Sequence, residues 1–557
     1  MNLVGDTFGK GYDYDVPCFC EMKKDYIKFI DGLLNNLHLS IENEQKDVIE
    51  SFEILLRWYT HNMLVHLTSP HGLEQYSGAA WGTRDVCQGP AEYFLATNHF
   101  DTLKRIILHV YSQQYQDNGN WPQWFMIDQY YRIQQHESHG DIIVWPLRLV
   151  SLYLERTKDY SILDEMVSYT RKPESTFSEE KYTLKEHIDN EVDNIIKNYI
   201  PNTSLSCYGG GDWDDTLQPA NHSLASNMVS GWTVALTYEV FTKMAKMMAD
   251  YSQEEAAKYA KLAADIKADY EKYLIVDGIP AGFAYFNGDQ IKYIIHPQDQ
   301  ETGMKYRLLP LNRGIVADLF EEEMKEHSLA LIQEHLLHPD GVRLMDKTVP
   351  YLGGINTYFM RAETASNFGR EIGLQYCHAH IRYCEALAKL GRGEDLLKAL
   401  LTINPVSLHE NVKNALPRQR NCYFSSSDGN FLNRYEAMAH FDDLKTGEVG
   451  VKGGWRVYSS GPGIYVNQII SHFLGIRVNG DNLVLDPVLD PSLDGLQVSY
   501  EVLGHKLNIT YVTDLIARVL VNGNEVEYTT VGNKYRQNGC AIKLSDLDKE
   551  VNITVRI

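Results

Sequence analysis

A chain of 557 residues is longer than one hydrophobic core usually supports, which predicts two or more domains. The formal net charge of −22 argues against nucleic acid and anionic membranes as partners, and an anionic substrate would need a local cluster of Arg, Lys and His. The sequence has no run of about 18 apolar residues that could span a bilayer. Its first residues also lack the basic and apolar regions of a signal peptide.

Eight cysteines are scattered along the chain without a paired C-x-x-C set, so the sequence does not predict a zinc site. We interpret them as free thiols in a reducing compartment, which predicts a cytoplasmic protein. We expect no metal and no cofactor.

Residues 1–20 read as a lead-in, and the following segment, 21–478, reads mainly as helices. Apolar residues recur at helical spacing, for example over 229–244 and 381–388. The loops between the helices are long and rich in Trp, Gly, Asp and His. Helix pairs separated by such loops fit a toroid better than a bundle, because loops on one rim can build a site. We therefore predict a mainly α protein with an (α/α)6 toroid as its catalytic domain.

The hydrophobic period changes near residue 480. Apolar and polar residues alternate over 498–502 and again over 507–511, on either side of Gly504-His505, as in a β-hairpin. Residues 551–557 read as a last strand. The sequence therefore predicts a small C-terminal antiparallel β domain over 479–557.

The most informative segment is 208–217 (YGGGDWDDTL), in which three acids surround a tryptophan behind three glycines. Glycines let backbone approach a ligand closely. Desolvation beside the flat face of a tryptophan raises the pKa of a carboxyl group and makes it a usable general acid near neutral pH. The alternative interpretation is an acidic turn that caps a helix.

Four further segments carry groups that suit carbohydrate chemistry. In 81–85 (WGTRD), Arg84 and Asp85 can bind sugar hydroxyls or form a structural salt bridge. Segment 139–146 (HGDIIVWP) offers a sugar-contacting or loop-fixing role, and less readily a metal site. The third segment, 370–378 (REIGLQYCH), contains Arg, Glu, Gln and His side chains. The fourth, 452–463 (KGGWRVYSSGPG), combines cations, hydroxyls and free N–H groups, so it can hold an oxyanion or be an ordinary Gly/Ser turn.

Taken together and in this order, the segments resemble the inverting β-glucoside phosphorylases of the cellobiose phosphorylase family, glycoside hydrolase family 94. The family's motifs match this sequence at 84–85, 211–215, 370–379, 453–460 and 474–487. Segment 419–429 (QRNCYFSSSDG) looks most like the 1,2-β-oligoglucan phosphorylases of that family.

The resemblance implies a role for each matching residue. Asp215 is the general acid that protonates the glycosidic oxygen. Other residues are implied to bind the sugars or phosphate. Sugar contacts fall to Arg84, Asp85, Trp213, Asp141, Arg370, Glu371 and Gln375, and phosphate contacts to His378, Ser459 and Ser460.

The chemistry of the residues agrees with this resemblance. An inverting hydrolase needs an acid and a second carboxylate that activates water. A phosphorylase needs only the acid, because phosphate is already an ionised nucleophile. Segment 452–461 contains Lys, Arg, Ser and Gly but no acid, which suits a phosphate site in a chain this acidic.

The sequence departs from the family pattern in two respects. Family members usually carry a large N-terminal β-sandwich, whereas this chain begins almost at the helices. The departure is consistent with a short form, one piece of a split enzyme or a protein that lost activity, and we expect either a homodimer or a partner chain that supplies the sandwich. Ser460 also stands where the family has a glycine in the phosphate loop.

Three functions remain open from the sequence. The leading one is phosphorolysis of a β-glucan by inorganic phosphate, giving α-glucose 1-phosphate and a shortened glucan. The second is an inverting β-glucan hydrolase in which Asp141 or Glu371 is the base. The third is a non-catalytic glucan-binding partner subunit.

Overall fold

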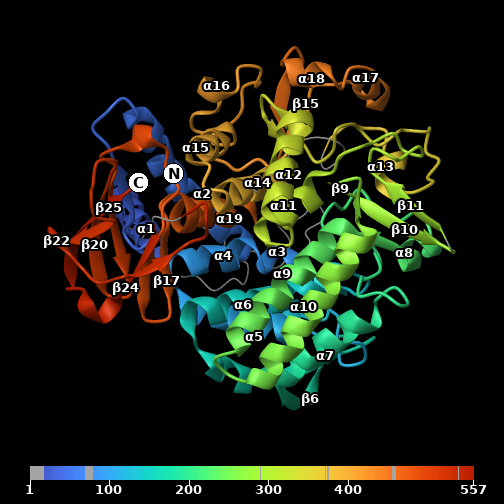
Figure 1. Ribbon diagram of the computed structural model, residues 1–557, viewed down its shortest axis with the longest axis horizontal. Coiled ribbons are helices and arrows are strands. Elements are labelled where there is room, and N and C mark those ends of the chain that lie inside the picture. The colour runs from blue at the N-terminus through green and yellow to red at the C-terminus, as the bar shows by residue number, and fades with distance from the viewer. Residues whose placement is uncertain are drawn as a thin grey trace.

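Helices and a C-terminal sheet unit make up the computed structural model, which describes residues 18–68, 80–288, 290–369, 372, 375–454, 460–536 and 539–557 (Figure 1). This confirms the prediction that strands follow a mainly helical segment and form a sheet near the C-terminus. In the described part of the chain, no helix combines the length and the apolar character needed to cross a bilayer.

Six helices contact one another in a closed cyclic order (Figure 1). They are α4 (Gly89–Ala96), α6 (Trp145–Thr157), α9 (Gly231–Met248), α11 (Leu308–Val316), α14 (Cys377–Lys389) and α19 (Gly461–Asn467), and α19 closes the ring on α4. We call them the ring helices.

A second set of helices packs outside the ring. Along the ring these are α5 (Phe100–Ser112) against α4 and α6, α10 (Gln253–Tyr273) against α9, α12 (Glu322–Leu331) against α11, α15 (Gly393–Thr402) against α14, and α2 (Lys46–Leu67) against α19. The remaining helices are α1 (Phe19–Leu33), α3 (Thr83–Val86), α7 (Leu184–Lys197), α8 (His222–Asn227), α13 (Met360–Thr364), α16 (Leu408–Asn411), α17 (Arg434–Ala439) and α18 (Asp443–Thr446).

The sequences of α9 and α10 show why one helix is inside and the other outside. In α9, every residue from Gly231 to Phe241 is buried, as expected of a helix that is surrounded by protein. In α10 only one stripe is buried, with Tyr259, Ala263, Ile266 and Tyr270 at spacings of three or four residues. The outer helix therefore keeps a polar face for water.

The segments between the helices contain short strands that pair into small sheets. They are β2 (Trp81–Gly82), β3 (Trp124–Phe125), β4 (Gln134–Gln135), β5 (Met166–Arg171), β6 (Thr176–Thr183), β7 (Met228–Ser230), β8 (Ile275–Val276), β9 (Ile279–Pro280), β10 (Phe283–Asn287), β11 (Gln290–Ile294), β12 (Leu337–His338), β13 (Gly341–Val342), β14 (Gln375–Tyr376), β15 (Ser426–Gly429) and β16 (Val451–Gly453).

The C-terminal unit contains two sheets. One has the order β1-β19-β20-β25-β21-β22 and the other β17-β18-β24-β23. Their strands are β1 (His38–Ser40), β17 (Ile476–Asn479), β18 (Asn482–Leu485), β19 (Gln497–Val502), β20 (His505–Val512), β21 (Val519–Val521), β22 (Asn524–Glu525), β23 (Thr529–Val531), β24 (Gly539–Lys543) and β25 (Glu550–Arg556).

The prediction of a wholly antiparallel C-terminal domain was wrong at one pair. Strands β20 and β25 run parallel, with Lys506 opposite Glu550 and Val512 opposite Arg556. A parallel pair needs a long crossover, and the segment between these strands includes β21 to β24. Strand β1 also joins this unit by pairing with β19, although residues 38–40 lie in the segment that we assigned to the helical domain.

The predicted site residues come from the N-terminal ends of the ring helices. Arg84 precedes α4, Asp141 precedes α6, His378 lies in the first turn of α14, and Ser460 directly precedes α19. Loop 208–219 precedes β7, which leads into α9. The ring thus gathers these segments at one of its ends.

Candidate active site

Two glycine-containing loops lie against each other at this end of the ring. His139 and Gly209 form a β-bridge, and Gly140 N donates to Gly211 O at 2.8 Å. Gly209 and Gly211 have φ of 59° and 134°, a region that favours glycine. A Cβ on Gly140 would lie 2.4 Å from Tyr208 O, so this close approach also requires glycine. The contact brings the His139 and Asp215 segments together.

Asp215 lies at the centre of the site. Arg84 Nη2 donates to Asp215 Oδ1 at 2.7 Å, and His139 Nδ1 lies 3.3 Å from the same oxygen. The Asp215 side chain keeps 16% of its surface exposed, whereas that of Arg84 keeps 7%. Asp215 is therefore held by two basic groups and is still within reach of a ligand.

The pKa of Asp215 lies below its ordinary value. Burial raises this pKa, but the charge of Arg84 and the hydrogen bond from His139 outweigh burial. The pKa of His139 is raised, because the contacts with Asp215 outweigh its burial. The sequence had suggested that desolvation would dominate at an acid beside Trp213. Because the Arg84 guanidinium is paired with Asp215, the pKa of this acid is lowered instead of raised.

Asp141 forms an ion pair with Arg84. It is fully buried, lies 3.3 Å from Arg84 Nη1 and accepts from Trp145 Nε1 at 2.9 Å. Arg84 Nη1 also donates to the carbonyl oxygen of Asp212 at 3.1 Å. Burial raises the pKa of Asp141, against the opposing charge of Arg84. The geometry makes Asp141 a positioning group for Arg84.

The other acids of the 208–217 segment fix its backbone. Asp212 is buried, and both of its carboxylate oxygens accept from Arg307 Nη2 at 2.9 Å. Asp214 Oδ1 accepts from the backbone N of Thr216 at 3.1 Å. Of the three acids, Asp215 is the one whose carboxylate is paired with Arg84 and His139 in the described residues, whereas Asp212 contacts both through its backbone carbonyl oxygen.

Trp213 packs within a cluster of aromatic rings. Its ring stacks on that of Trp232, with the ring centroids 6.1 Å apart. It makes edge contacts with Tyr376 and His378 at centroid distances of 5.5 and 5.9 Å. It is 6% exposed. Trp213 therefore links the Asp215 loop to the start of α14.

His378 and Ser460 converge as predicted for two of the three phosphate-binding residues. His378 Nε2 lies 2.9 Å from Ser460 Oγ, and Ser460 Oγ donates to Asp85 Oδ1 at 3.3 Å. Tyr423 OH lies 3.0 Å from His378 Nδ1. Burial, followed by the charge of Arg382, lowers the pKa of His378 to about 3. The imidazole is therefore neutral at physiological pH, and donation by Tyr423 leaves its Nε2–H as a donor.

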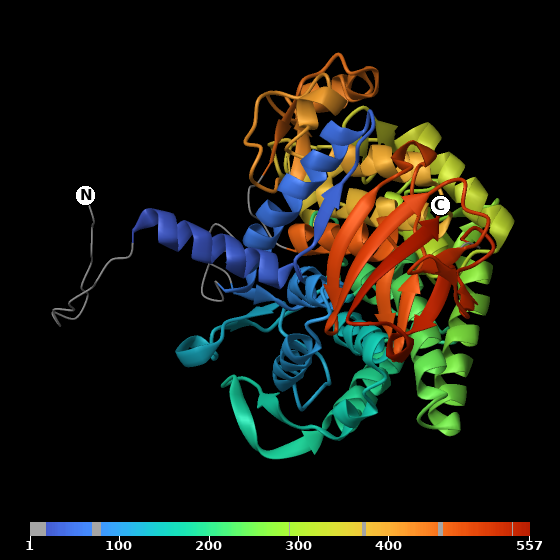
Figure 2. The ribbon, with the colours of Figure 1, turned by 90° about the vertical axis from the view of Figure 1, so that its left-hand side faces the viewer.

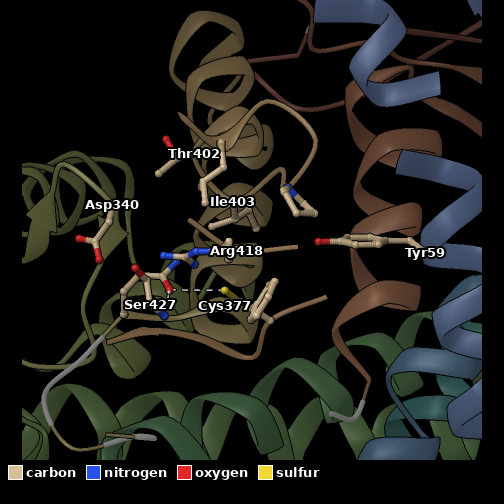
Figure 3. A pocket seen from close by; sticks show the side chains of 11 residues that line it. Tyr59, Asp340, Cys377, Thr402, Ile403, Arg418 and Ser427 are labelled. Atoms are coloured by element: carbon tan, nitrogen blue, oxygen red, sulfur yellow. Dashed lines mark hydrogen bonds between the residues drawn. The ribbon is translucent and has the colours of Figure 1, made fainter. Parts of the chain in front are cut away.

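Gln375 faces a different, small pocket of about 20 Å³ (Figure 3). It is fully buried on β14, and its Oε1 accepts from Cys377 Sγ at 3.4 Å and from Ser427 N at 3.2 Å. Figure 3 shows Cys377, Ser427 and Arg418 grouped there, across the pocket from Tyr59. A cavity needs roughly 10–15 Å³ to hold one water, so this pocket suits water rather than a sugar.

Three predicted residues, Arg370, Glu371 and Ser459, lie outside the described residues. Sequence reasoning did not select His139 as a site residue, although its H-G-D segment had been noticed. It also missed Tyr423, which lies within the 419–429 motif. The sequence did not indicate a role for Arg307, because no motif around it predicts its pairing with Asp212.

No group of three or more His, Cys, Asp and Glu side chains in the described ranges is arranged to hold a metal ion. All eight cysteines are free thiols.

Comparison with known proteins places this arrangement in a family. Residues 97–422 match the model of the glycosyl hydrolase 94 superfamily catalytic domain, and residues 475–553 match that of the glycoside phosphorylase C-terminal domain. A 1,2-beta-oligoglucan phosphorylase of Listeria innocua is 48% identical over 530 residues, which are 94% of this chain and 48% of that protein. An N,N'-diacetylchitobiose phosphorylase of Vibrio furnissii is 21% identical over 70% of this chain and 45% of its own length.

The chain thus spans about half the length of these two curated relatives. Among solved structures, a sialidase shares the fold with a TM-score of 0.52 at 12% identity, over 92% of this chain and 42% of that one. The family model covers more than half of the 557 residues, and the Listeria protein matches nearly all of them. The chain therefore belongs to the glycosyl hydrolase 94 superfamily.

Proposed function

We propose that this protein catalyses the inverting phosphorolysis of β-linked oligoglucans. A phosphate oxygen attacks the anomeric carbon from the face opposite the glycosidic oxygen, and the carbon–oxygen bond to the leaving sugar breaks. Asp215 transfers its proton to the departing oxygen. The products are α-glucose 1-phosphate and a shortened glucan. The name of the Listeria relative supports a 1,2 linkage in the substrate.

One chain of contacts carries this proposal. Arg84 contacts Asp215, and the next residue, Asp85, contacts Ser460, which contacts His378. A candidate acid and a candidate oxyanion site are therefore joined through two consecutive residues. An inverting phosphorolysis needs both within reach of one glycosidic bond.

The protonation of Asp215 follows from the same contacts. Beside Arg84 and His139 its carboxyl is ionised at neutral pH, since its pKa is lowered. A phosphate dianion that binds nearby competes for the charge of Arg84 and repels a second negative charge, which raises the pKa of Asp215. Substrate binding thus favours the protonated acid that bond cleavage requires. The reverse reaction uses the ionised form as a base.

We assign the remaining positions by family resemblance. Trp213, Arg84 and Asp85 contact the glucosyl unit, and Arg370 and Glu371 lie toward the leaving sugar, whereas Gln375 faces the small separate pocket and is assigned no sugar contact. His378, Ser459 and Ser460 bind phosphate, which is the co-substrate, and the scheme uses no further cofactor. Asp141 acts through Arg84.

The hydrolase alternative needs a base beside a water molecule. Asp141 is fully buried and engaged by Arg84 and Trp145, so it does not suit that task, and Glu371, the other candidate base, lies outside the described residues. The non-catalytic alternative offers no reason for the pairing of Arg84 with Asp215. Both observations favour the phosphorylase.

Mass spectrometry of the products from a panel of β-glucans, with and without phosphate, tests the function. We expect hexose phosphate only when phosphate is present, with β-1,2-glucan as the best substrate. Asp215→Asn is the matched control for contaminating activity. Phosphate-independent release of free glucose with incorporation of oxygen-18 from water would instead establish a hydrolase.

We also propose that the ring helices and their outer partners form an (α/α)6 toroid. The closed cyclic order of contacts among α4, α6, α9, α11, α14 and α19 supports this arrangement. An experimental structure that lacks the α19–α4 contact would contradict it.

For the assembly we propose that helix α1 contacts a partner, either a second copy of this chain or a different chain. Helix α1 projects from the rest of the protein (Figure 2) and exposes Phe19, Met22, Tyr26, Ile27 and Phe29. Such an apolar surface is typical of a protein interface. Light scattering tests the assembly, since a homodimer of this chain alone would identify the partner as a second copy.

The free thiols support our proposal of a cytoplasmic location. Fractionation of the native source, followed by immunodetection, tests it.

A further inference from the structure

A second cavity, of about 620 Å³, lies toward the C-terminal ends of the ring helices, whereas the Asp215 site lies at their N-terminal ends. Every ring helix contributes to its wall, with Glu92, Arg148, Glu239, Val316, Glu385 and Asn467. The C-terminal unit forms the other wall through β17, β18 and residues 531–536. Helix α6 contacts β17 beside it (Figure 1). The volume falls in the range of roughly 300–1,000 Å³ that is typical of small-molecule sites.

Three arginines line this cavity, and two of them share one carboxylate. Arg477 Nη2 and Arg536 Nη2 donate to Asp486 Oδ2 at 2.6 and 2.9 Å. Arg156 also lines the cavity, as does its neighbour Glu155, whose charge acts on Arg156 and which pairs with Lys243 at 3.0 Å. Arg156 donates to Ser471 Oγ and the Val478 carbonyl at 3.3 and 3.4 Å, which are long hydrogen bonds. The whole lining has seven Lys or Arg and six Asp or Glu side chains, and its positive excess lies at these three arginines, which outnumber Asp486 and Glu155.

The local pKa values reflect this accumulation of charge. Burial, and then the charge of Arg477, lower the pKa of Arg156 and of Arg536 to about 10. Burial and Arg536 also lower the pKa of His472, which lines the same cavity. This cluster occurs in a chain whose net charge is −22. Like charges kept close together in a cavity indicate that an anion completes the site.

Helix dipoles do not account for the whole cluster. Arg156 lies in the last turn of α6, where a cation is favourable. Arg477, however, lies on a β-strand, and Arg536 lies in a loop. Asp486 brings these two together, so one carboxylate serves two arginines, and the charge of Arg156 is added to theirs.

We propose that this cavity is a second binding site for a phosphate group, either as inorganic phosphate or on a phosphorylated sugar. Guanidinium groups bind phosphate oxygens through two parallel N–H bonds, and Arg156, Arg477 and Arg536 approach the cavity from three different elements. Lys246 on α9 adds positive charge to its lining, whereas Lys243 is paired with Glu155 at 3.0 Å. Because the arginines come from both units, bound phosphate would tie the C-terminal sheets to the helix ring.

Crystals of the full chain soaked in tungstate, an anomalously scattering phosphate mimic, locate the anion directly. We expect one peak within hydrogen-bonding distance of Arg156, in addition to any peak near Ser460. Absence of the peak near Arg156 at a tungstate concentration that fills the Ser460 site would overturn the proposal.

Calorimetric titration with inorganic phosphate and with glucose 1-phosphate provides the solution test. We expect two sites per chain, and Arg156→Gln should weaken only one of them, by roughly ten- to a hundredfold, since it removes a hydrogen bond between charged groups. The matched control is Lys261→Gln, which removes the same charge from the exposed face of α10 and should change neither site. The ligand that binds the second site more tightly identifies the source of the phosphate group.

Two results would contradict the proposal. One is a single site per chain, and the other is a second site whose affinity Arg156→Gln leaves unchanged. If that variant fails to fold, the exposed Lys246→Gln replaces it, with an expected weakening of roughly twofold to tenfold because a more solvated charge is lost.

Discussion

Arg84 Nη2 donates to Asp215 Oδ1 at 2.7 Å across 131 positions of the sequence. The same guanidinium also forms an ion pair with Asp141, which is fully buried. Arg84 is therefore a rigid cation that sets the ionisation of Asp215. Since Asp85 contacts Ser460, the position of Arg84 also determines how the proposed acid faces the proposed phosphate site.

Asp215→Asn should slow glucan phosphorolysis by about 10²–10⁴-fold or more, because the amide keeps the shape but has no proton to transfer. An aryl β-glucoside with a good leaving group needs little protonation, so its phosphorolysis should decrease far less. Rates on both substrates, with Asp214→Asn as the control for a neighbouring acid, check this. Equal losses on the two substrates would mean that Asp215 binds substrate or supports the loop.

Asp215→Asn should also reduce the free energy of unfolding at pH 7. The folded-state pKa of Asp215 is depressed below the unfolded value of about 3.9, so its ionised form stabilises the fold above that pH. This contribution is lost as the pH falls through the folded pKa. Urea denaturation of wild type and variant at pH 7 and pH 3 measures the difference between their free energies of unfolding. We expect this difference to be smaller at pH 3. A difference that does not change with pH would contradict the lowered pKa.

His378 should remain neutral throughout the range from pH 5 to 8. Burial and Arg382 lower its pKa to about 3, so protonation begins only well below that range. We expect His378→Gln to raise the KM for phosphate by roughly tenfold, the loss of one hydrogen bond to an anion, without changing the shape of the pH profile. Phosphate KM values across this range provide the measurement.

Tyr423→Phe is the companion variant to His378→Gln. It removes the hydroxyl beside His378 Nδ1 and leaves the imidazole in place. We expect a smaller rise in KM from this change. An ionisation near pH 6.5 that disappears in His378→Gln would show that the imidazole is charged in the working enzyme.

Arg307→Met should destabilise the protein by roughly 3–5 kcal/mol, because it leaves the carboxylate of Asp212 buried without its cation. The two side chains are 1% and 0% exposed. Adding Asp212→Asn to this variant should restore part of the loss, since no buried charge then remains. Urea denaturation of the three proteins checks both steps. A double variant as unstable as the single one would show that Arg307 acts through packing.

Local patterns in the sequence were sufficient for much of the fold. The apolar residues of 229–244 predicted a helix within what is now α9, and the alternation over 498–502 and 507–511 predicted β19 and β20. These patterns work because a helix or a strand repeats its orientation over a few residues. Strand pairing is different. The parallel contact of β20 with β25 joins residues 44 positions apart, which no local period specifies.

The ordered motifs of the sequence determined the family and the choice of Asp215, because a proton donor, an Arg-Asp pair and an anion loop are recognisable by residue type. Tertiary structure alone decided how these groups act on one another. Asp141 was predicted to contact sugar and lies buried behind Arg84, and Gln375 faces a pocket of about 20 Å³. The pKa of Asp215 is lowered because the charge of Arg84, from a distant segment, outweighs desolvation. Burial and charge pairing depend on three-dimensional distance, which only the folded chain defines.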